Sequence, residues 1–456
     1  MFSPLTNRTY ARLFGAQVTA LLGTGLTTVA LALLAYELAG GDAGWVLGTA
    51  LAIKMIAYVT LAPIAGSFAQ FLPRRPFLIG LDLARAAFVA CLPFVTEVWQ
   101  VYVLIFLMQA CSAGFTPTFQ ATIPDVLKDE AEYTKALSLS RLAYDLENLL
   151  SPTLAAAALL LMSFDVLFAA NAIAFLVSAS LVFSVLLPKP EPATEFHGVL
   201  AHITFGVRAY LATPRLRGLL ALSMAVASAG AMVIVNTVVY VRGYLDLGEK
   251  ETAILLATFG AGSMLAALLL PRLLSDFPDR LVMASGGLLM AAGLAVGTFM
   301  PSFGVIMAVW FAIGIGYSIV QTPAGRLLRR SSSEGDRPAY FAAQFALSHA
   351  CWLVTYPLAG WLGSSFGLET AFAVLCALAI TASVSGLILW PAHDPQELEH
   401  THEAVVHEHL HIHDEHHQHE HEGWEGPEPH SHPHGHKPVH QTHGYVVDAH
   451  HPNWPV

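Results

Sequence analysis

Charged residues are scarce in this chain, and their scarcity excludes an ordinary soluble domain. Only 12% of the 456 residues are Asp, Glu, Lys or Arg, whereas 55% are hydrophobic. A soluble domain has about 25% charged residues, roughly twice this share. The composition therefore predicts an integral membrane protein.

Several chemical signatures are missing as well. The four cysteines, Cys91, Cys111, Cys351 and Cys376, lie inside long apolar runs without C-x-x-C spacing, so we expect neither disulfides nor a thiolate metal site. No Gly-rich loop is followed by Lys and Ser or Thr, and we therefore expect no use of ATP. A Ser/His/Asp arrangement is also absent, so the chain is not expected to be an enzyme or to need a cofactor.

The net charge of −11 belongs entirely to the end of the chain. Residues 392–456 contain twelve acidic residues and one lysine, whereas the preceding 391 residues contain 21 acidic and 21 basic residues. The body of the protein is therefore electrically balanced, and nothing in it favours a nucleic-acid partner.

Hydrophobic runs long enough to cross a bilayer recur throughout the body of the chain. A spanning helix needs about 20 apolar residues, and such runs lie near 10–37, 45–70, 77–96, 98–121, 136–162, 164–187, 215–242, 250–274, 281–300, 302–325, 338–364 and 367–390. This pattern predicts an all-α membrane protein with twelve transmembrane helices in two six-helix bundles, residues 1–187 and 215–390. Residues 188–214 are expected to be a cytoplasmic linker that continues as an amphipathic helix.

The basic residues between these runs predict the orientation. With the N-terminus inside, sixteen Lys and Arg residues fall on the cytoplasmic side, and only Arg242 and Lys250 fall outside. Because basic residues accumulate on the cytoplasmic side, we expect both termini in the cytoplasm.

An internal repeat supports the division into two bundles. Residues 114–140, after the fourth run, and residues 320–348, after the tenth, both contain Thr-Pro, a charged connection and then a Tyr followed by an Ala-rich stretch. Six-helix repeats that handle substrate near the membrane midplane are a feature of secondary transporters.

A few polar residues lie at membrane depth, where they are costly and usually face a cavity or a partner. Lys54, Gln109 and His349 are each about ten residues into their runs, near the bilayer centre. His349 is interpreted either as a metal ligand or proton relay, or as a histidine that only bonds a neighbouring helix.

Two carboxylates in the fifth run are the main candidates for coupling. Asp145 and Glu147 point to different faces of that helix. Each can bind a divalent cation or carry a proton; alternatively, Arg141 neutralises Asp145 and Lys54 neutralises Glu147. On the third run, Asp82 and Arg85 are spaced as a local ion pair.

The last segment, residues 391–456, is rich in histidine. Nineteen of the 22 histidines lie between His393 and His451, interleaved with Glu, Asp and Pro. Imidazole ligates Ni²⁺, Co²⁺, Cu²⁺ and Zn²⁺, so the composition favours metal binding over an inert tail or a purification tag. Its low apolar content predicts disorder without metal. The expected ligands are His400, His402, His407, His409, His411, His413, His416, His417, His419, His421, His430, His432, His434 and His436.

Three segments carry a family resemblance: NRTYARLFGAQ near the N-terminus, GSFAQFLPRRPFLIGLDLAR between the second and third runs, and TP…EYTKALSLSRL. They resemble the branch of the major facilitator superfamily that contains bacterial siderophore and drug exporters. With its histidine-rich C-terminus, the chain is similar to nickel-resistance exporters of the NreB type.

One loop departs from the family's pattern. The family usually has Gly-x-x-x-Asp-Arg between the second and third helices, but here Gly66 is followed by Gln70 and Phe71, and only Arg74 and Arg75 are retained. The usual aspartate of the gate is therefore missing. The loop between the eighth and ninth runs, with Asp276, Asp279 and Arg280, is a candidate substitute.

The resemblance implies a proton-driven exporter of Ni²⁺, with Co²⁺ as a second candidate cargo, from a bacterial cytoplasm across the inner membrane. We expect the exporter to be a monomer. In this hypothesis the tail collects metal in the cytoplasm. Two alternatives stay open. One is an exporter of a drug or siderophore whose tail buffers metal. The other is a membrane protein that stores or senses metal without transporting it.

Overall fold

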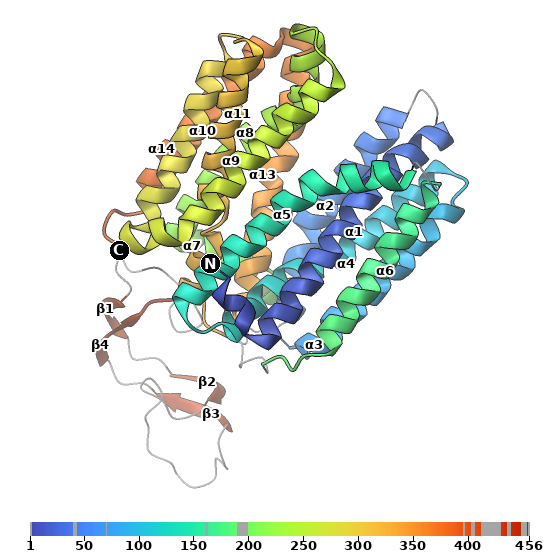
Figure 1. Ribbon diagram of the computed structural model, residues 1–456. Coiled ribbons are helices and arrows are strands. Elements are labelled where there is room, and N and C mark those ends of the chain that lie inside the picture. The colour runs from blue at the N-terminus through green and yellow to red at the C-terminus, as the bar shows by residue number, and fades with distance from the viewer. Residues whose placement is uncertain are drawn as a thin grey trace.

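The computed structural model describes residues 2–39, 43–69, 71–159, 163–188, 199–394, 397–402, 406–411, 430–435, 439–447 and 454. Within these residues the fold is dominated by helices, which stand side by side in two groups (Figure 1). We call α1 to α6 the N-terminal group and α8 to α14 the C-terminal group.

The N-terminal group follows a short 3₁₀ turn, η1 (Ser3–Thr6). Its helices are α1 (Arg8–Ala39), α2 (Ala43–Ala69), α3 (Arg74–Cys91) with the short η3 (Leu92–Phe94), α4 (Val98–Val126), α5 (Glu130–Leu159) and α6 (Asp165–Phe183).

The C-terminal group follows the shorter helix α7 (Val199–Ala212). It consists of α8 (Pro214–Val238) with the π-helical turn η4 (Val239–Tyr244), α9 (Glu249–Asp276), α10 (Asp279–Gly297), α11 (Phe303–Gln321), the short α12 (Ala324–Arg330), α13 (Arg337–Phe366) and α14 (Leu368–Leu389).

In the described part of the chain, ten helices are long and apolar enough to cross a membrane. Helices α5 and α13 are not among them, although each has 30 residues. Both helices are continuous, but Arg141, Asp145 and Glu147 interrupt the apolar sequence of α5, and Gln344 and His349 interrupt that of α13. The prediction of an all-helical membrane fold is confirmed, while crossing by α5 and α13, and hence twelve spans, stays a prediction.

Small residues bring the helices of the C-terminal group close together. A Cβ atom added at Gly314 on α11 would lie 2.0 Å from the carbonyl oxygen of Phe259 on α9, and one added at Gly262 would lie 2.1 Å from that of Phe311. Glycine at both positions therefore permits backbone contact, as is typical of helices packed in membranes.

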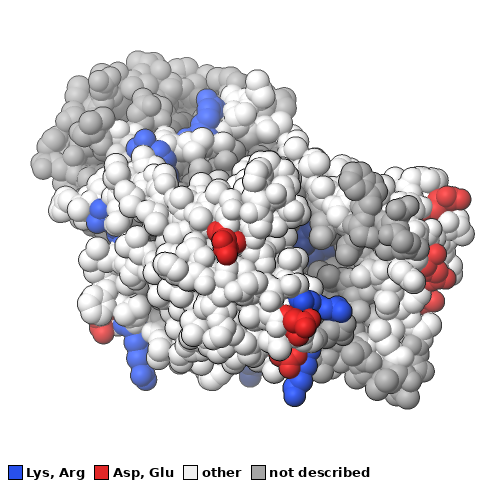
Figure 2. Space-filling view, turned by 90° about the horizontal axis from the view of Figure 1, so that it is seen from above, with Lys and Arg blue, Asp and Glu red and all other residues white. Residues whose placement is uncertain are grey.

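The two groups contact each other through a few helices. Helix α13 packs against α2 and α4, and α5 packs against α9. Figure 1 shows the groups converging toward the end where α3 begins. The face drawn in Figure 2 is mostly free of Lys, Arg, Asp and Glu in its described parts, as expected for a protein with so few charges.

Helix α7 lies inside the predicted linker and packs against the helices. Tyr210 on α7 is fully buried and bonds Gln344 of α13. The predicted amphipathic helix therefore turns one face toward α13.

The described tail segments contain four strands. β1 (Glu397–His402) pairs antiparallel with β4 (Val439–Gly444), and β2 (Val406–His411) pairs antiparallel with β3 (His430–Gly435). The prediction that the tail is disordered without metal stays a prediction.

Candidate functional site

Three of the residues expected at membrane depth converge on Tyr58 of α2. The Tyr58 hydroxyl donates a hydrogen bond of 2.7 Å to Oε1 of the buried Gln109 on α4. The Lys54 ammonium lies 5.7 Å from the centroid of the Tyr58 ring, and the His349 ring centroid lies 4.8 Å from it. Tyr58 was not singled out from the sequence, although it stands one helical turn after Lys54 and therefore on the same face.

Helix α13 closes this cluster from the C-terminal group. The ring of Phe345 lies 4.7 Å from that of Tyr58, and His349 Nδ1 lies 2.7 Å from the carbonyl oxygen of Phe345. Because a carbonyl only accepts, Nδ1 carries the proton of the neutral ring. Nε2 of His349 therefore keeps a lone pair for a proton, a cation or a polar cargo.

Asp145 lies where α5 meets the C-terminal group. It is only 3% exposed, and its Oδ1 accepts from Arg141 Nε at 3.0 Å. Its Oδ2 accepts from Ser263 of α9 at 2.7 Å, and the Arg141 guanidinium lies 4.9 Å from the Tyr317 ring of α11. One ion pair of the N-terminal group thus contacts two helices of the other group, α9 through Ser263 and α11 through Tyr317.

Glu147 faces elsewhere, as its spacing from Asp145 predicts. It lies against α1, where a Cβ added at Gly25 would come 2.9 Å from Glu147 Oε1. Lys54 and Arg141 are the cations that act on its carboxylate. Glu147 is therefore the carboxylate on the Lys54 side of the interface, and Asp145 is the one on the Ser263 side.

Asp82 and Arg85 form an ion pair within α3. Ser178 of α6 donates to Asp82 at 2.7 Å, and the Arg85 guanidinium lies 4.0 and 4.5 Å from the rings of Phe115 and Phe175. All these partners belong to the N-terminal group, so the pair joins α3, α4 and α6.

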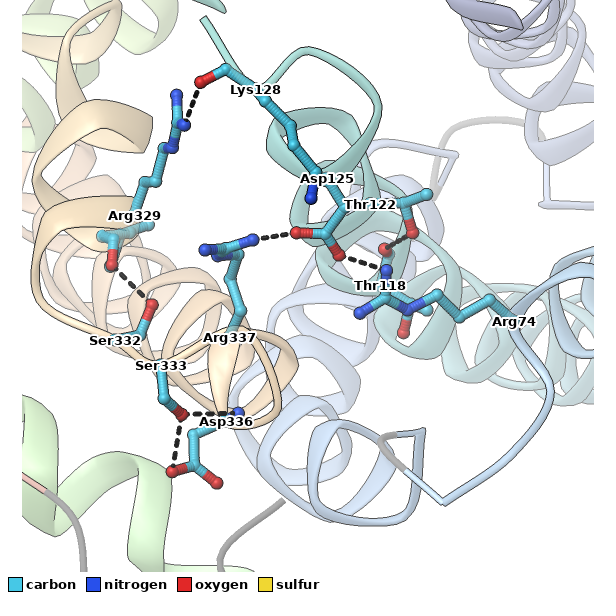
Figure 3. Close-up of polar contacts among 11 residues, drawn as sticks. Arg74, Thr118, Thr122, Asp125, Lys128, Arg329, Ser332, Ser333, Asp336 and Arg337 are labelled. Carbon is cyan, nitrogen blue, oxygen red and sulfur yellow. Dashed lines mark hydrogen bonds and ion pairs between the residues drawn. The ribbon is translucent and has the colours of Figure 1, made fainter. Parts of the chain in front are cut away.

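At the end of the interface near α3, one carboxylate joins the two groups. Asp125, at the end of α4, accepts from Arg74 of α3 and from Arg337 of α13 (Figure 3). All three residues are buried. Removal of the carboxylate would leave two buried arginines without a compensating charge, which is costly.

A second set of contacts surrounds Asp125. Arg326 of α12 donates to Glu130 of α5 at 2.8 Å, and Arg329 bonds the carbonyl oxygen of Lys128. These residues belong to the two copies of the internal repeat, so the structure packs one copy against the other. We call Asp125, Arg74, Arg337, Glu130 and Arg326 the gate.

Of the other gate candidates from the sequence, Asp279 lies 3.8 Å from the gate residue Arg326, and the rest have contacts within their own group of helices. Arg75 bonds the carbonyl of Phe183 and lies over its ring, Asp276 accepts from Ser275, and Arg280 donates to the carbonyls of Trp390 and Leu387. None of these contacts joins the two groups. Asp125 supplies a carboxylate to Arg74 in place of the aspartate missing after Gly66. In the sequence, the feature that could have indicated Asp125 is its place directly after Pro124 in the first copy of the internal repeat.

Near the gate, Glu132 provides a solvent-exposed contrast. Lys135 donates to its carboxylate at 2.7 Å, which lowers the pKa of Glu132. Both side chains are about one-third exposed, so water screens this pair far more than the gate.

Eight of the fourteen expected tail ligands lie in strands that the structure describes. His400, His402, His407, His409, His411, His430, His432 and His434 lie in β1, β2 and β3. His413, His416, His417, His419, His421 and His436 lie outside the described residues.

Membrane-length helices in two groups, with a polar cluster between them and an ion-pair gate at one end, define a multi-pass membrane transporter. A model of the Major Facilitator Superfamily matches residues 13–247 and 219–425. The chain belongs to this superfamily.

Relatives and solved structures agree with this assignment. Two Bacillus subtilis (strain 168) proteins, the uncharacterized MFS-type transporters YfiS and YvqJ, are each 24% identical, over 72% and 80% of this chain and 81% and 90% of their own lengths. The human organic anion transporter MFSD10 (TETRAN) has a similar fold, with a TM-score of 0.72, 12% identity, and coverage of 83% of this chain and 99% of that one. A bacterial homologue of the iron transporter ferroportin in an outward-facing state has a TM-score of 0.70, 15% identity, and coverage of 84% and 99%.

Proposed function

We propose that this protein exports a divalent transition-metal cation, Ni²⁺ first and Co²⁺ second, from a bacterial cytoplasm in exchange for protons. In this proposal α5 and α13 cross the membrane with the other helices, both termini are cytoplasmic, and the gate closes the cytoplasmic end. The carrier works as a monomer and resembles nickel exporters of the NreB type.

One observation carries the choice of cargo: the imidazole-rich tail leaves the helices beside the gate. Asp394, the last residue described before the strands, lies 3.2 Å from Arg215 and 3.4 Å from Arg330. Arg330 is the last residue of α12, which also carries the gate residue Arg326. A tether at this point raises the local concentration of captured cations at the inner mouth.

The interior residues have complementary roles in this proposal. Glu147 and His349 Nε2 offer donors to a cation at the Tyr58 cluster, while Asp145 and Glu147 are candidate proton carriers. The fold is shared with a homologue of the iron transporter ferroportin, so metal cations are a cargo that this fold accommodates.

The test is metal uptake into inverted membrane vesicles, with and without an imposed proton gradient, using Ni²⁺, Co²⁺ and Zn²⁺. We expect gradient-dependent uptake that is lost in the variants Asp145→Asn and Glu147→Gln, because neither amide can carry the proton. Deletion of residues 393–456 should lower metal tolerance of cells without abolishing it. Tolerance that is unchanged in both carboxylate variants would indicate a storage or sensing protein.

A second candidate function has its own support. In the part of the chain that the structure describes, no group of three or more His, Cys, Asp and Glu residues could hold a metal ion. The Tyr58 and Phe345 rings beside Lys54 instead suit an aromatic or anionic organic cargo. Vesicles that ignore all three metals but accumulate a fluorescent organic anion would establish this function, with the tail as a metal buffer.

A further inference from the structure

A charged cavity lies beside the gate, where α9 ends and α10 begins. Its volume is about 210 Å³, which is room for about seven water molecules at about 30 Å³ each. It is separate from the Tyr58 cluster, whose residues come from α2, α4 and α13. The charged residues that line it are Asp279, Arg280, Arg326, Arg330 and Asp394.

Positive charge exceeds negative charge in this cavity. Three arginines against two aspartates give the lining a net charge of +1. Asp394 is shared between Arg330, at 3.4 Å, and Arg215, which lies outside the lining at 3.2 Å. Arg280 is held by two backbone carbonyl oxygens at the end of α14, which carry no formal charge. The lining is therefore suited to a ligand with one negative charge.

Two sets of N–H donors border the cavity. Helix α10 begins there, at Asp279, and the first N–H groups of a helix lack intrahelical partners and attract anions. Arg326 adds a guanidinium that its known partners do not exhaust. It donates to Glu130 at 2.8 Å and lies 3.8 Å from Asp279, but its Nε has no hydrogen-bond partner among the described residues. A guanidinium fork matches the oxygen atoms of a phosphate group.

The rim of the cavity is apolar and exposed. Phe277, which lines the cavity, is 55% exposed. Leu281, directly after Arg280 on α10, is 54% exposed, and Ile388 on α14 is 76% exposed. Both helices are long and apolar enough to cross a membrane, so these side chains face lipid. A ligand that enters here places its charge beside hydrocarbon, as a phospholipid does and a free phosphate ion does not.

We propose that this cavity binds the phosphodiester headgroup of an anionic phospholipid, with the acyl chains outside it along Phe277. A phosphodiester carries one negative charge, which balances the lining. Basic pockets between transmembrane helices bind such headgroups. The inference goes beyond the proposed function, because it does not depend on the cargo. Since Arg326 also belongs to the gate, the bound lipid borders the gate.

The test is lipid binding to the full-length protein in detergent, followed by native mass spectrometry and by the melting temperature. Phosphatidylglycerol is compared with phosphatidylcholine of the same acyl chains, and with inorganic phosphate and glycerol 3-phosphate. We expect saturable binding and a higher melting temperature with phosphatidylglycerol alone. Equal binding of phosphatidylcholine would overturn the proposal, and equal stabilisation by the soluble phosphates would overturn a lipid as the ligand.

Matched variants test the cavity itself. Arg326→Gln removes one lining charge, and we expect the affinity for phosphatidylglycerol to fall roughly fivefold, the contribution of one basic residue near an anionic lipid surface. Arg329→Gln is the control. Arg329 lies on the same helix and also bonds the N-terminal group, through the Lys128 carbonyl, but it does not line the cavity. Its affinity should stay within about twofold of wild type.

A third variant reverses the sign of the effect. Asp279→Asn raises the net charge of the lining to +2, and we expect roughly fivefold tighter binding of phosphatidylglycerol. A purely structural role of these residues would weaken binding in both Arg326→Gln and Asp279→Asn. Weaker binding in Asp279→Asn, or equal losses in Arg326→Gln and Arg329→Gln, would overturn the proposal. Neither result bears on metal uptake, which is measured separately.

Discussion

Arg337 at the start of α13 donates to Asp125 at the end of α4, across 212 positions of sequence, and so ties the C-terminal group of helices to the N-terminal group. Arg74 holds the other oxygen of the same carboxylate. This shared carboxylate lies between the two copies of the internal repeat. The bond between Arg337 and Asp125 must break before the two groups can separate at this end, as alternating access requires, because it joins α13 to α4.

Neutralising Asp125 should open the gate. In Asp125→Asn the two arginines face each other without a carboxylate, and loss of one partner from a buried ion pair costs about 3–5 kcal/mol. We expect a lower melting temperature in detergent and faster hydrogen exchange over residues 326–340. Glu132→Gln is the control, since its exposed pair with Lys135 is worth less than about 1 kcal/mol. Equal effects of the two variants would contradict a gating role.

A side chain at Gly66 should wedge α2 away from α13. A Cβ atom there would lie 2.3 Å from Ala342 Cβ and 3.2 Å from the Pro338 carbonyl oxygen. We therefore expect Gly66→Ala to destabilise the closed gate and speed hydrogen exchange at the start of α13. Gly48, on the same helix, has nothing within 4 Å, so Gly48→Ala should stabilise the protein by up to about 1 kcal/mol through helix propensity. The same sign of change in both variants would argue against close packing at Gly66.

Removing the Ser263 hydroxyl should loosen the centre of the interface without removing charge. Ser263→Ala deletes one hydrogen bond to a carboxylate, worth about 1.5–3 kcal/mol, while the Arg141 pair of Asp145 remains. We expect a changed uptake rate in vesicles whose dependence on the proton gradient persists. Loss of that dependence would show that Ser263 itself belongs to the proton path.

The end of the tail around Val447 should be released more often when its hydrogen bond from Tyr340 is removed. Tyr340→Phe deletes the bond to the Val447 carbonyl, worth about 1 kcal/mol, or roughly fivefold in the balance between docked and released tail. Limited proteolysis should then cut the tail faster. Tyr244→Phe removes a like bond, from its hydroxyl to the Met300 carbonyl, and should leave the cutting rate unchanged. Faster cutting in both variants would mean a general loosening.

Sequence patterns predicted where the helices lie but not which residues meet. Lys54, Gln109 and His349 were chosen by depth, which follows from counting residues along each apolar run. Their convergence on Tyr58 depends on how α2, α4 and α13 pack. The gate was sought among the loop charges Arg74, Arg75, Asp276, Asp279 and Arg280, because charge in a loop is visible in sequence. Arg74 bonds Asp125 and Asp279 lies 3.8 Å from Arg326, but the carboxylate that joins the two groups depends on side-chain directions that sequence does not show.

The amino-acid sequence alone determined that this is a helical membrane protein with a histidine-rich end, because span length and composition are local properties of the chain. Only the tertiary structure decided that Asp125 takes Arg337 and Arg74, that Ser263 bonds Asp145, and that Val447 returns to Tyr340. Those partnerships join residues far apart in sequence. They exist only because helix packing excludes water and leaves each buried polar group to bond whatever the neighbouring helix presents.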